Sequence, residues 1–316
     1  MSLAIGKARA LQQLLQNGRF KVVAIDHRDV FVEMMKSANH YKSIESVTNE
    51  KIEIIKVCRD YASGFLIDPH YALPKCILDY EIPGNVGFMV NIEDNDYSEK
   101  AIKGEYFIKD FSPEKVKRMG ASAVKMFIYY NPESEQVSVY EEMINKIAES
   151  CLKVELPFLI EPVLFSLDDK PISASERVRL TYLTIERLKK FKIDIFKIDF
   201  PGNVNEYSNE ENIKICSKIS EMLNVPWVIM SSGIDEVTFL RQLELACQGG
   251  ASGYVVGRVL WKQFVICKDE ERDKYRKEMP IILNKFNEVV DKYAKPVTDI
   301  VQFTEKYNQT DWYQKY

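Results

Sequence analysis

The sequence predicts a single (β/α)8 barrel, and three observations support this fold class. Eight short apolar or β-branched runs alternate with longer segments whose apolar residues recur at helical spacing. The 316 residues and the 46% hydrophobic content suit one α/β barrel with one large core. The first run continues into A-I-D-H-R-D, which lacks the glycine-rich turn of a doubly wound sheet. A doubly wound sheet remains the alternative fold.

The eight runs have the length of buried barrel strands. In chain order, the expected strands are 20–25, 64–67, 86–90, 122–128, 157–160, 194–198, 226–230 and 252–256. The clearest expected helices between them are 47–62, 136–154, 174–191, 207–223 and 235–248. The charged amphipathic segment 269–294 follows the last strand, so we expect it to be the last barrel helix.

The whole chain, residues 1–316, is expected to form one domain, because no linker or low-complexity stretch interrupts the alternation. The first residues, M-S-L-A-I-G-K-A-R-A-L, have the pattern of an amphipathic helix and not that of a signal peptide. The tail 297–316 is expected to extend the barrel and pack on its floor.

Composition excludes several classes of partner. The net charge is −4 with both signs interspersed, and no apolar run reaches the ~20 residues of a membrane span, so neither nucleic acid nor a membrane is expected.

Six cysteines lie scattered without a C-x-x-C pair, which is typical of a reduced, cytoplasmic protein. The three histidines lack metal-ligand spacing. No metal and no cofactor is expected, although a carboxylate-bound magnesium is harder to exclude.

Nearly every expected strand ends in polar or ionisable residues. Active sites of such barrels lie at this end of the strands, so these side chains are the candidate site. They are Asp26, His27, Arg28, Asp68, Asn91, Glu93, Lys125, Glu161, Lys197, Asp199, Ser231, Ser232, Gly233, Gly257 and Arg258.

Two lysines, Lys125 and Lys197, lie inside apolar strand runs. A buried amine is costly unless it has a function, and a desolvated lysine can attack a carbonyl to form a Schiff base. The alternation of side chains places Lys125 opposite Val124 and Met126, so it can point into the barrel. Glu161, on the strand between the two lysines, can then transfer protons. The alternative is a lysine that reaches solvent or pairs with a carboxylate.

The last two strands end in a predicted phosphate site. The segment S-S-G at 231–233 precedes a helix, and Gly257 with Arg258 follows the eighth strand. Free backbone amides and an arginine are the groups that bind phosphate in this fold. Helix capping by Ser232 is the competing explanation.

Seven segments, in order, resemble the class I tagatose-1,6-bisphosphate aldolases over roughly residues 20–265. They are A-I-D-H-R, G-F-L-I-D-P-H-Y-A-L-P, S-A-V-K-M-F-I-Y-Y, P-F-L-I-E-P, D-I-F-K-I-D-F-P, V-I-M-S-S-G and V-V-G-R-V-L-W. The resemblance implies a TIM barrel that cleaves a ketose bisphosphate through a Schiff base. The products would be dihydroxyacetone phosphate and glyceraldehyde 3-phosphate.

The resemblance also implies roles for individual residues. Lys197 matches the Schiff-base lysine, Glu161 the acid/base and Lys125 the second lysine. The remaining matches bind substrate: Asp26, His27, Arg28, Asp68, Ser231, Ser232, Gly233, Gly257 and Arg258. The implied partner is a small phosphosugar, and a homo-oligomer is left open.

Two departures from the family pattern leave the substrate open. His27 replaces a glutamine with a group that can carry charge, and Asp199 replaces a glutamate. Other segments are closer to the sulfofructose-1-phosphate aldolases, which would release sulfolactaldehyde instead. A non-catalytic sugar-phosphate sensor and a barrel isomerase or epimerase are the further alternatives.

Overall fold

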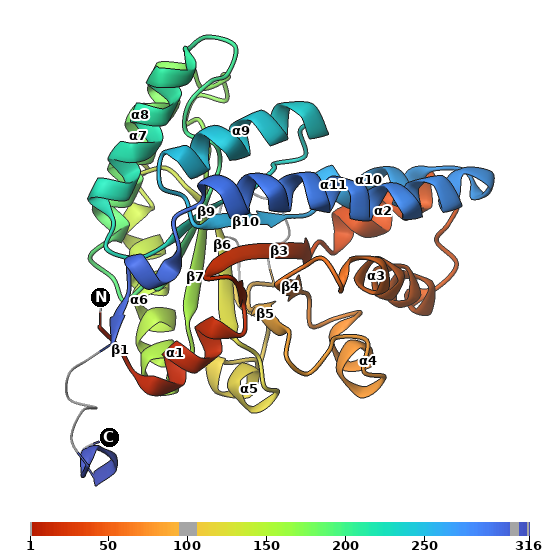
Figure 1. Cartoon of the computed structure of the whole chain (residues 1–316), viewed down its shortest axis with the longest axis horizontal. Helices are drawn as coiled ribbons and strands as arrows, with labels where there is room; N and C mark the ends of the chain where they lie inside the picture. Colours follow the sequence, from red (N-terminus) through yellow and green to blue (C-terminus); the bar gives the residue numbers. More distant parts are fainter. Residues whose placement is uncertain (1, 95–105, 304–309, 315) are drawn as a thin grey trace.

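The computed structural model describes residues 2–94, 106–303, 310–314 and 316, and a closed barrel of eight parallel strands forms its centre (Figure 1). The strands are β3 (Arg19–Ile25), β4 (Gly64–Ile67), β5 (Gly87–Asn91), β6 (Ala123–Tyr130), β7 (Phe158–Leu164), β8 (Ile195–Ile198), β9 (Trp227–Ile229) and β10 (Gly253–Val256). Each pairs with its neighbour in sequence, and β10 pairs with β3 to close the ring. The (β/α)8 prediction is confirmed.

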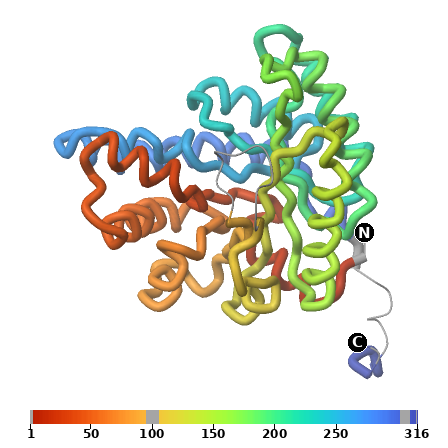
Figure 2. Tube along the Cα trace, turned by 180° about the vertical axis from the view of Figure 1, so that it is seen from behind, coloured from red at the N-terminus to blue at the C-terminus, as the bar shows by residue number. Residues whose placement is uncertain are grey.

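Helices surround the barrel, as Figures 1 and 2 show from opposite sides. They are α2 (Asp29–Ser37), α3 (Ile44–Cys58), α4 (Leu73–Leu78), α5 (Pro113–Arg118), α6 (Val137–Lys153), α7 (Ala174–Leu188), α8 (Asn209–Met222), α9 (Glu236–Gln248), α10 (Arg258–Ile266) and α11 (Arg272–Tyr293). Serine or aspartate side chains cap the first turns of α3, α7, α8 and α9. The sequence prediction placed α3 three residues late and did not specify the short α2, α4, α5 and α10.

Two apolar clusters flank the strands. The smaller one fills the barrel interior and includes Ala123 of β6, while Val124 and Met126 belong to the larger cluster beneath the helices. Side chains alternate along a strand, so Lys125 shares the inner face with Ala123. The strand thus points this lysine into the barrel, as predicted.

The barrel closes where β10 meets β3, and a glycine makes this seam possible. Gly253 has φ +129°, and a Cβ at this position would collide with the carbonyl oxygen of Phe20. Without a side chain, the two strands can pair from Gly253–Phe20 to Val256–Val23.

Both ends of the chain cover the barrel floor. The strands β1 (Ser2–Leu3) and β11 (Gln302–Phe303) pair with each other, and α1 (Ile5–Gln12) follows β1. The strand β2 (Leu15–Gln16) adds an antiparallel pair to β3. Val297 and Val301 pack in the barrel-interior cluster with Leu11. The first part of the tail therefore packs on the barrel; residues 304–309 and 315 lie outside the described residues.

All six cysteines are free and buried. Burial raises the pKa of each thiol, to about 12 for Cys76 and Cys216. They are core residues, as their scattered positions predicted. None of the described helices is long and apolar enough to cross a membrane.

Candidate active site

Lys125 lies at the centre of a buried charge cluster at the carboxyl end of the strands. Its ammonium group is 3.0 Å from Asp26 Oδ2, 2.9 Å from Glu93 Oε1 and 3.0 Å from Glu161 Oε2. Asp26 directly follows β3, Glu93 lies just beyond β5 and Glu161 lies within β7. The Lys125 side chain is fully buried. Three negative partners offset the desolvation of this one ammonium group.

Glu161 connects this cluster to the second lysine. Its Oε1 lies 2.9 Å from Lys197 Nζ, while its Oε2 contacts Lys125. Lys197 is on β8 and Glu161 on the neighbouring β7. One carboxylate thus lies within proton-transfer distance of Lys197, in the arrangement that a nucleophilic lysine and its acid/base require.

The charges in the cluster change how its acids ionise. Burial alone would raise the pKa of Asp26, but the positive charges of Lys125 and Lys197 hold it well below its usual value. Burial raises the pKa of Glu93, and the attraction of Lys125 does not fully offset this. Asp26 is therefore a fixed negative charge, while Glu93 protonates more readily than an exposed glutamate.

His27 is neutral near pH 7. Burial lowers the pKa of its imidazole to about 3, although the neighbouring Asp26 acts in the opposite direction. The ring also packs edge-on against Trp261, with centroids 5.1 Å apart. The expectation that His27 would bring a charge to the site is not met, because burial removes it.

A cavity of about 370 Å³ opens above Lys197. It is lined by Ala24, His27, Val30, Tyr129, Glu161, Val163, Lys197, Asp199, Met230, Ser231, Ser232, Val255, Gly257 and Arg258. Eight of the predicted site residues are therefore brought together around one space. Lys125 and Asp26 contact it indirectly, through Glu161 and His27.

The predicted phosphate groups meet on one side of this cavity. Ser232 and Gly233 both have a positive φ, of 47° and 78°, and neither amide donates to a protein acceptor among the described residues. Arg258 lies across this turn, since a Cβ on Gly233 would be 3.3 Å from its Cζ. Free amides beside a guanidinium form a suitable site for an anion.

Comparison with known proteins shows what the chain is related to. The family model described as DeoC/LacD family aldolase matches residues 20–263. The chain belongs to this aldolase family.

Individual relatives agree with this assignment. This aldolase is 27% identical to "Tagatose 1,6-diphosphate aldolase" of Lactococcus lactis, over 95% of its own length and 100% of the relative's. It is 25% identical to "Tagatose 1,6-diphosphate aldolase 2" of Enterococcus faecalis, over 84% and 86% of the two chains. A solved structure of a Schiff-base-forming fructose-1,6-bisphosphate aldolase is similar in fold, with a TM-score of 0.62, 18% identity and coverage of 90% and 99%.

Four predicted substrate-binding residues of the aldolase lie outside the cavity lining: Asp26, Arg28, Asp68 and Gly233. Two of them, Asp68 and Arg28, are held by contacts away from the cavity. Both oxygens of Asp68 are occupied: Oδ2 accepts from Lys51 Nζ, and Oδ1 accepts from the amides of His70 and Tyr71 at 2.9 Å. Asp68 is fully buried in these contacts. Asp68 therefore has no free oxygen directed at the cavity.

Arg28 is the second such residue. Its guanidinium lies 3.2 Å from Asp94 Oδ1 and 3.1 Å from His70 Nε2. It is buried, outside the lining of the Lys197 cavity and at the start of α2.

Sequence reasoning missed Lys51, which lies on the core side of α3. Its ammonium donates to the carbonyls of Ile25 at 3.0 Å and His27 at 2.7 Å, besides Asp68. The signal was available, because Lys51 follows Val47 by four residues and precedes Ile55 by four, on the apolar stripe of the helix. The role of Glu93 as a partner of Lys125 was also missed.

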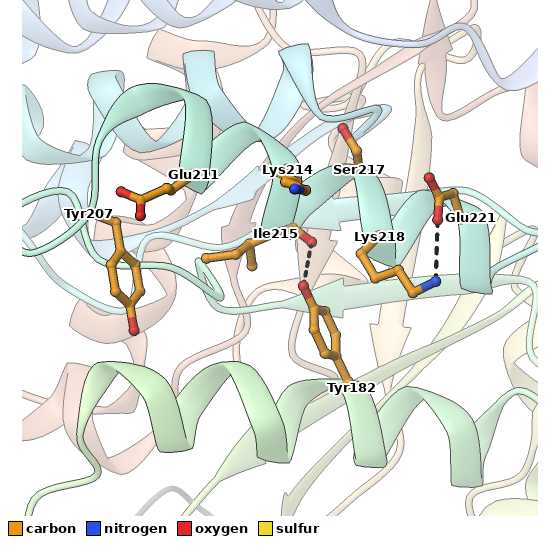
Figure 3. Close-up of a pocket in the computed structure, with 8 residues that line it drawn as sticks. All are labelled: Tyr182, Tyr207, Glu211, Lys214, Ile215, Ser217, Lys218 and Glu221. Carbon is orange, nitrogen blue, oxygen red and sulfur yellow. Dashed lines mark hydrogen bonds and ion pairs between the residues drawn. The ribbon is translucent and has the colours of Figure 1, made fainter.

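A larger recess of about 550 Å³ lies on the outer surface, between α7 and α8 (Figure 3). The Tyr182 hydroxyl donates to the Ile215 carbonyl at 3.1 Å, and Lys218 pairs with Glu221 at 3.3 Å. No lysine or acid in its lining is buried. Among the described residues, no group of three or more histidine, cysteine or acidic side chains could hold a metal ion.

Proposed function

We propose that this aldolase is a class I enzyme that cleaves a ketohexose bisphosphate, most specifically tagatose 1,6-bisphosphate. The products are dihydroxyacetone phosphate and glyceraldehyde 3-phosphate. The observation that carries the proposal is Lys197 Nζ, 2.9 Å from Glu161 at the floor of an open cavity. The names of the Lactococcus and Enterococcus relatives support the choice of substrate.

The two residues act in sequence on the ketone. Lys197, after giving a proton to Glu161, attacks the C2 carbonyl through Nζ. Glu161 returns a proton to the carbinolamine oxygen, water leaves, and an iminium forms. Glu161 then takes the C4 hydroxyl proton while the C3–C4 electrons flow into the iminium, which releases the aldehyde. Protonation of the enamine at C3 and hydrolysis regenerate Lys197.

Lys125 acts electrostatically in this scheme. Three carboxylates hold its ammonium, so it is fixed as a positive charge beside Glu161. This charge stays 3.0 Å from Glu161 Oε2, on the side of the carboxylate away from Lys197.

Phosphate binding orients the substrate over Lys197. The Ser231–Gly233 turn, Gly257 and Arg258 bind the C1 phosphate, because they gather free amides and a guanidinium beside Lys197. His27, as a neutral ring, hydrogen-bonds the sugar hydroxyls, and Asp26 acts on the substrate through His27. Arg28 binds the anion on carbon 6 after it exchanges Asp94 for the substrate.

Borohydride trapping tests the proposal. Incubation with dihydroxyacetone phosphate and borohydride should leave a covalent adduct on Lys197, mapped by mass spectrometry. The Lys197→Met variant should give no adduct and lose cleavage activity. An adduct on Lys125 with Lys197 unmodified would overturn the assignment.

A substrate panel tests the finer choice. Coupled cleavage assays should rank tagatose 1,6-bisphosphate above fructose 1,6-bisphosphate and sulfofructose 1-phosphate. A higher kcat/KM for sulfofructose 1-phosphate would replace the proposed substrate without changing the proposed chemistry.

The buried free thiols support the reducing cytoplasm as the compartment of the enzyme.

A further inference from the structure

A second cavity, of about 340 Å³, adjoins the active-site cavity. The two share Asp199, Met230, Ser231 and Ser232 as lining residues. The Ser232 hydroxyl donates to Asp199 Oδ1, so this hydrogen-bonded pair separates the two spaces. The second cavity lies between the β8–α8 connection and the first turns of α7 and α9, because its lining includes Asn203, Arg177 and Thr238.

Arg177 gives this cavity its charge. The side chain is half-buried, and its guanidinium forms no ion pair or hydrogen bond within the part of the chain that the structure describes. Its charge is nevertheless close enough to oppose the effect of burial on the pKa of Asp199. A half-buried guanidinium with five donors and no paired acceptor is an open binding group for an anion.

The rest of the lining is suited to hydroxyl groups and a carbon skeleton. Asn205, Thr238 and Gln242 contribute side-chain polar atoms that find no partner among the described residues, while Asn203 already donates to Glu206 at 2.7 Å. Phe200, Val204 and Ile234 supply apolar surface. An anion site, several neutral hydrogen-bonding groups and an apolar wall match a phosphorylated sugar or polyol.

We propose that this second cavity is a binding site for a monophosphorylated sugar or polyol, with the phosphate on Arg177 and the hydroxyls on Asn205, Thr238 and Gln242. The site is separate from the cavity above Lys197 and does not depend on the aldolase reaction. A ligand there touches the same Ser231–Ser232 turn from the other side, so the two sites share a wall.

Glucitol 6-phosphate is a suitable probe, because it has no carbonyl group and cannot form a Schiff base with Lys197. Calorimetry measures its Kd, and a crystal soaked in it locates the phosphorus atom. The Arg177→Gln variant should weaken binding at this site by tenfold or more and remove the phosphorus beside position 177. Arg179→Gln is the matched control, because Arg179 is exposed on the same helix and pairs with Glu133 and Glu176.

The outcomes separate this site from the active site. Phosphorus beside Arg177 in the wild type and in Arg179→Gln, but not in Arg177→Gln, supports the proposal. Phosphorus only at Arg258, or the same Kd in Arg177→Gln and wild type, overturns it. Thermal unfolding of both variants shows whether they fold as the wild type does. Borohydride trapping on Lys197 reports on the aldolase proposal independently.

Discussion

Glu161 divides its two oxygens between two lysines, and their surroundings give those lysines different roles. Lys125 is held by three carboxylates and has no exposed surface, so a substrate carbonyl cannot reach its nitrogen. Lys197 has Glu161 as its ion-pair partner and lines the cavity. The proposed nucleophile is therefore distinguished by access and not by burial, since both side chains are buried.

Asp199 provides a pH-dependent test at the residue scale. Burial raises its pKa from 3.8 to about 6, against the opposing charge of Arg177. Because the folded-state pKa is raised, the protonated form stabilises the fold, and this contribution is lost as the pH rises through 6. At pH 8 the ionised carboxylate costs up to about 3 kcal/mol relative to a neutral side chain.

The Asp199→Asn variant mimics the neutral form and can still accept a hydrogen bond from Ser232. We expect its free energy of unfolding to exceed that of the wild type at pH 8. At pH 5 this difference in the free energy of unfolding should fall to about half. Urea unfolding at the two pH values measures this. An equal difference in the free energy of unfolding at pH 5 and pH 8 would mean that Asp199 does not titrate near pH 6.

The residue identities at the site were easier to predict than their contacts. Lys197, Glu161 and Arg258 were each predicted from a charged residue in or just after an apolar strand run, which is a local pattern. Asp68 has the same local pattern, but Lys51 of a helix 17 positions earlier in the chain neutralises it. Such a pairing depends on tertiary packing, so strand-end position alone could not distinguish a substrate ligand from a structural ion pair.

At the scale of elements, the turn after β9 depends on Gly233. Its φ of +78° disfavours a side chain, and a Cβ would lie 3.3 to 3.6 Å from the Arg258 guanidinium. We expect Gly233→Ala to lose about 1–2 kcal/mol of stability through backbone strain. It should also raise the KM for a phosphorylated ketose on the order of tenfold, because Arg258 is displaced.

Gly120 offers a matched control for this prediction. It has nearly the same φ, +82°, but nothing lies within 4 Å of an added Cβ. Gly120→Ala should therefore lose similar stability and leave the KM unchanged. Steady-state kinetics and urea unfolding of both variants separate backbone strain from displacement of Arg258. A raised KM in both variants would contradict the explanation that Gly233→Ala acts on the KM by displacing Arg258.

The Lys51 ammonium joins three elements: α3, the end of β3 and the β4–α4 connection. Lys51→Met leaves the Asp68 carboxylate buried without its counter-charge, so we expect a loss of about 3–5 kcal/mol. The double variant Lys51→Met/Asp68→Asn should be more stable than the single variant, because it removes the uncompensated charge. Denaturant unfolding of the single and double variants tests this order of stability. A double variant less stable than Lys51→Met would contradict the prediction.

The end of β7 shows that local sequence patterns do not always predict where a strand ends. The expected strand 157–160 extends to Leu164 in β7, beyond Glu161 and Pro162, because it pairs with the long β6 residue by residue to Tyr130. A polar residue and a proline normally mark a strand end. β7 continues past these residues because β6 pairs with it. Local sequence does not reveal this pairing.

The whole molecule protects its thiols. All six cysteines are buried, and burial raises their pKa values, so few reactive thiolates exist in the folded state. We expect iodoacetamide at pH 8 to leave the native protein largely unlabelled and to modify all six thiols in urea. Intact-mass measurement checks this. Rapid labelling of native Cys58 or Cys247 would show that the core between barrel and helices opens readily.

The closure of the barrel has a consequence for biosynthesis. The strand β3 emerges early from the ribosome, yet its second partner, β10, lies more than 200 residues later. At about 5–20 residues per second, the edge of β3 waits on the order of ten to fifty seconds for that partner. An unpaired apolar edge can pair with other chains during this time. The nascent chain is thus the state most exposed to aggregation, and slower initiation or chaperone binding should raise the yield of folded enzyme more than added stability of the finished barrel.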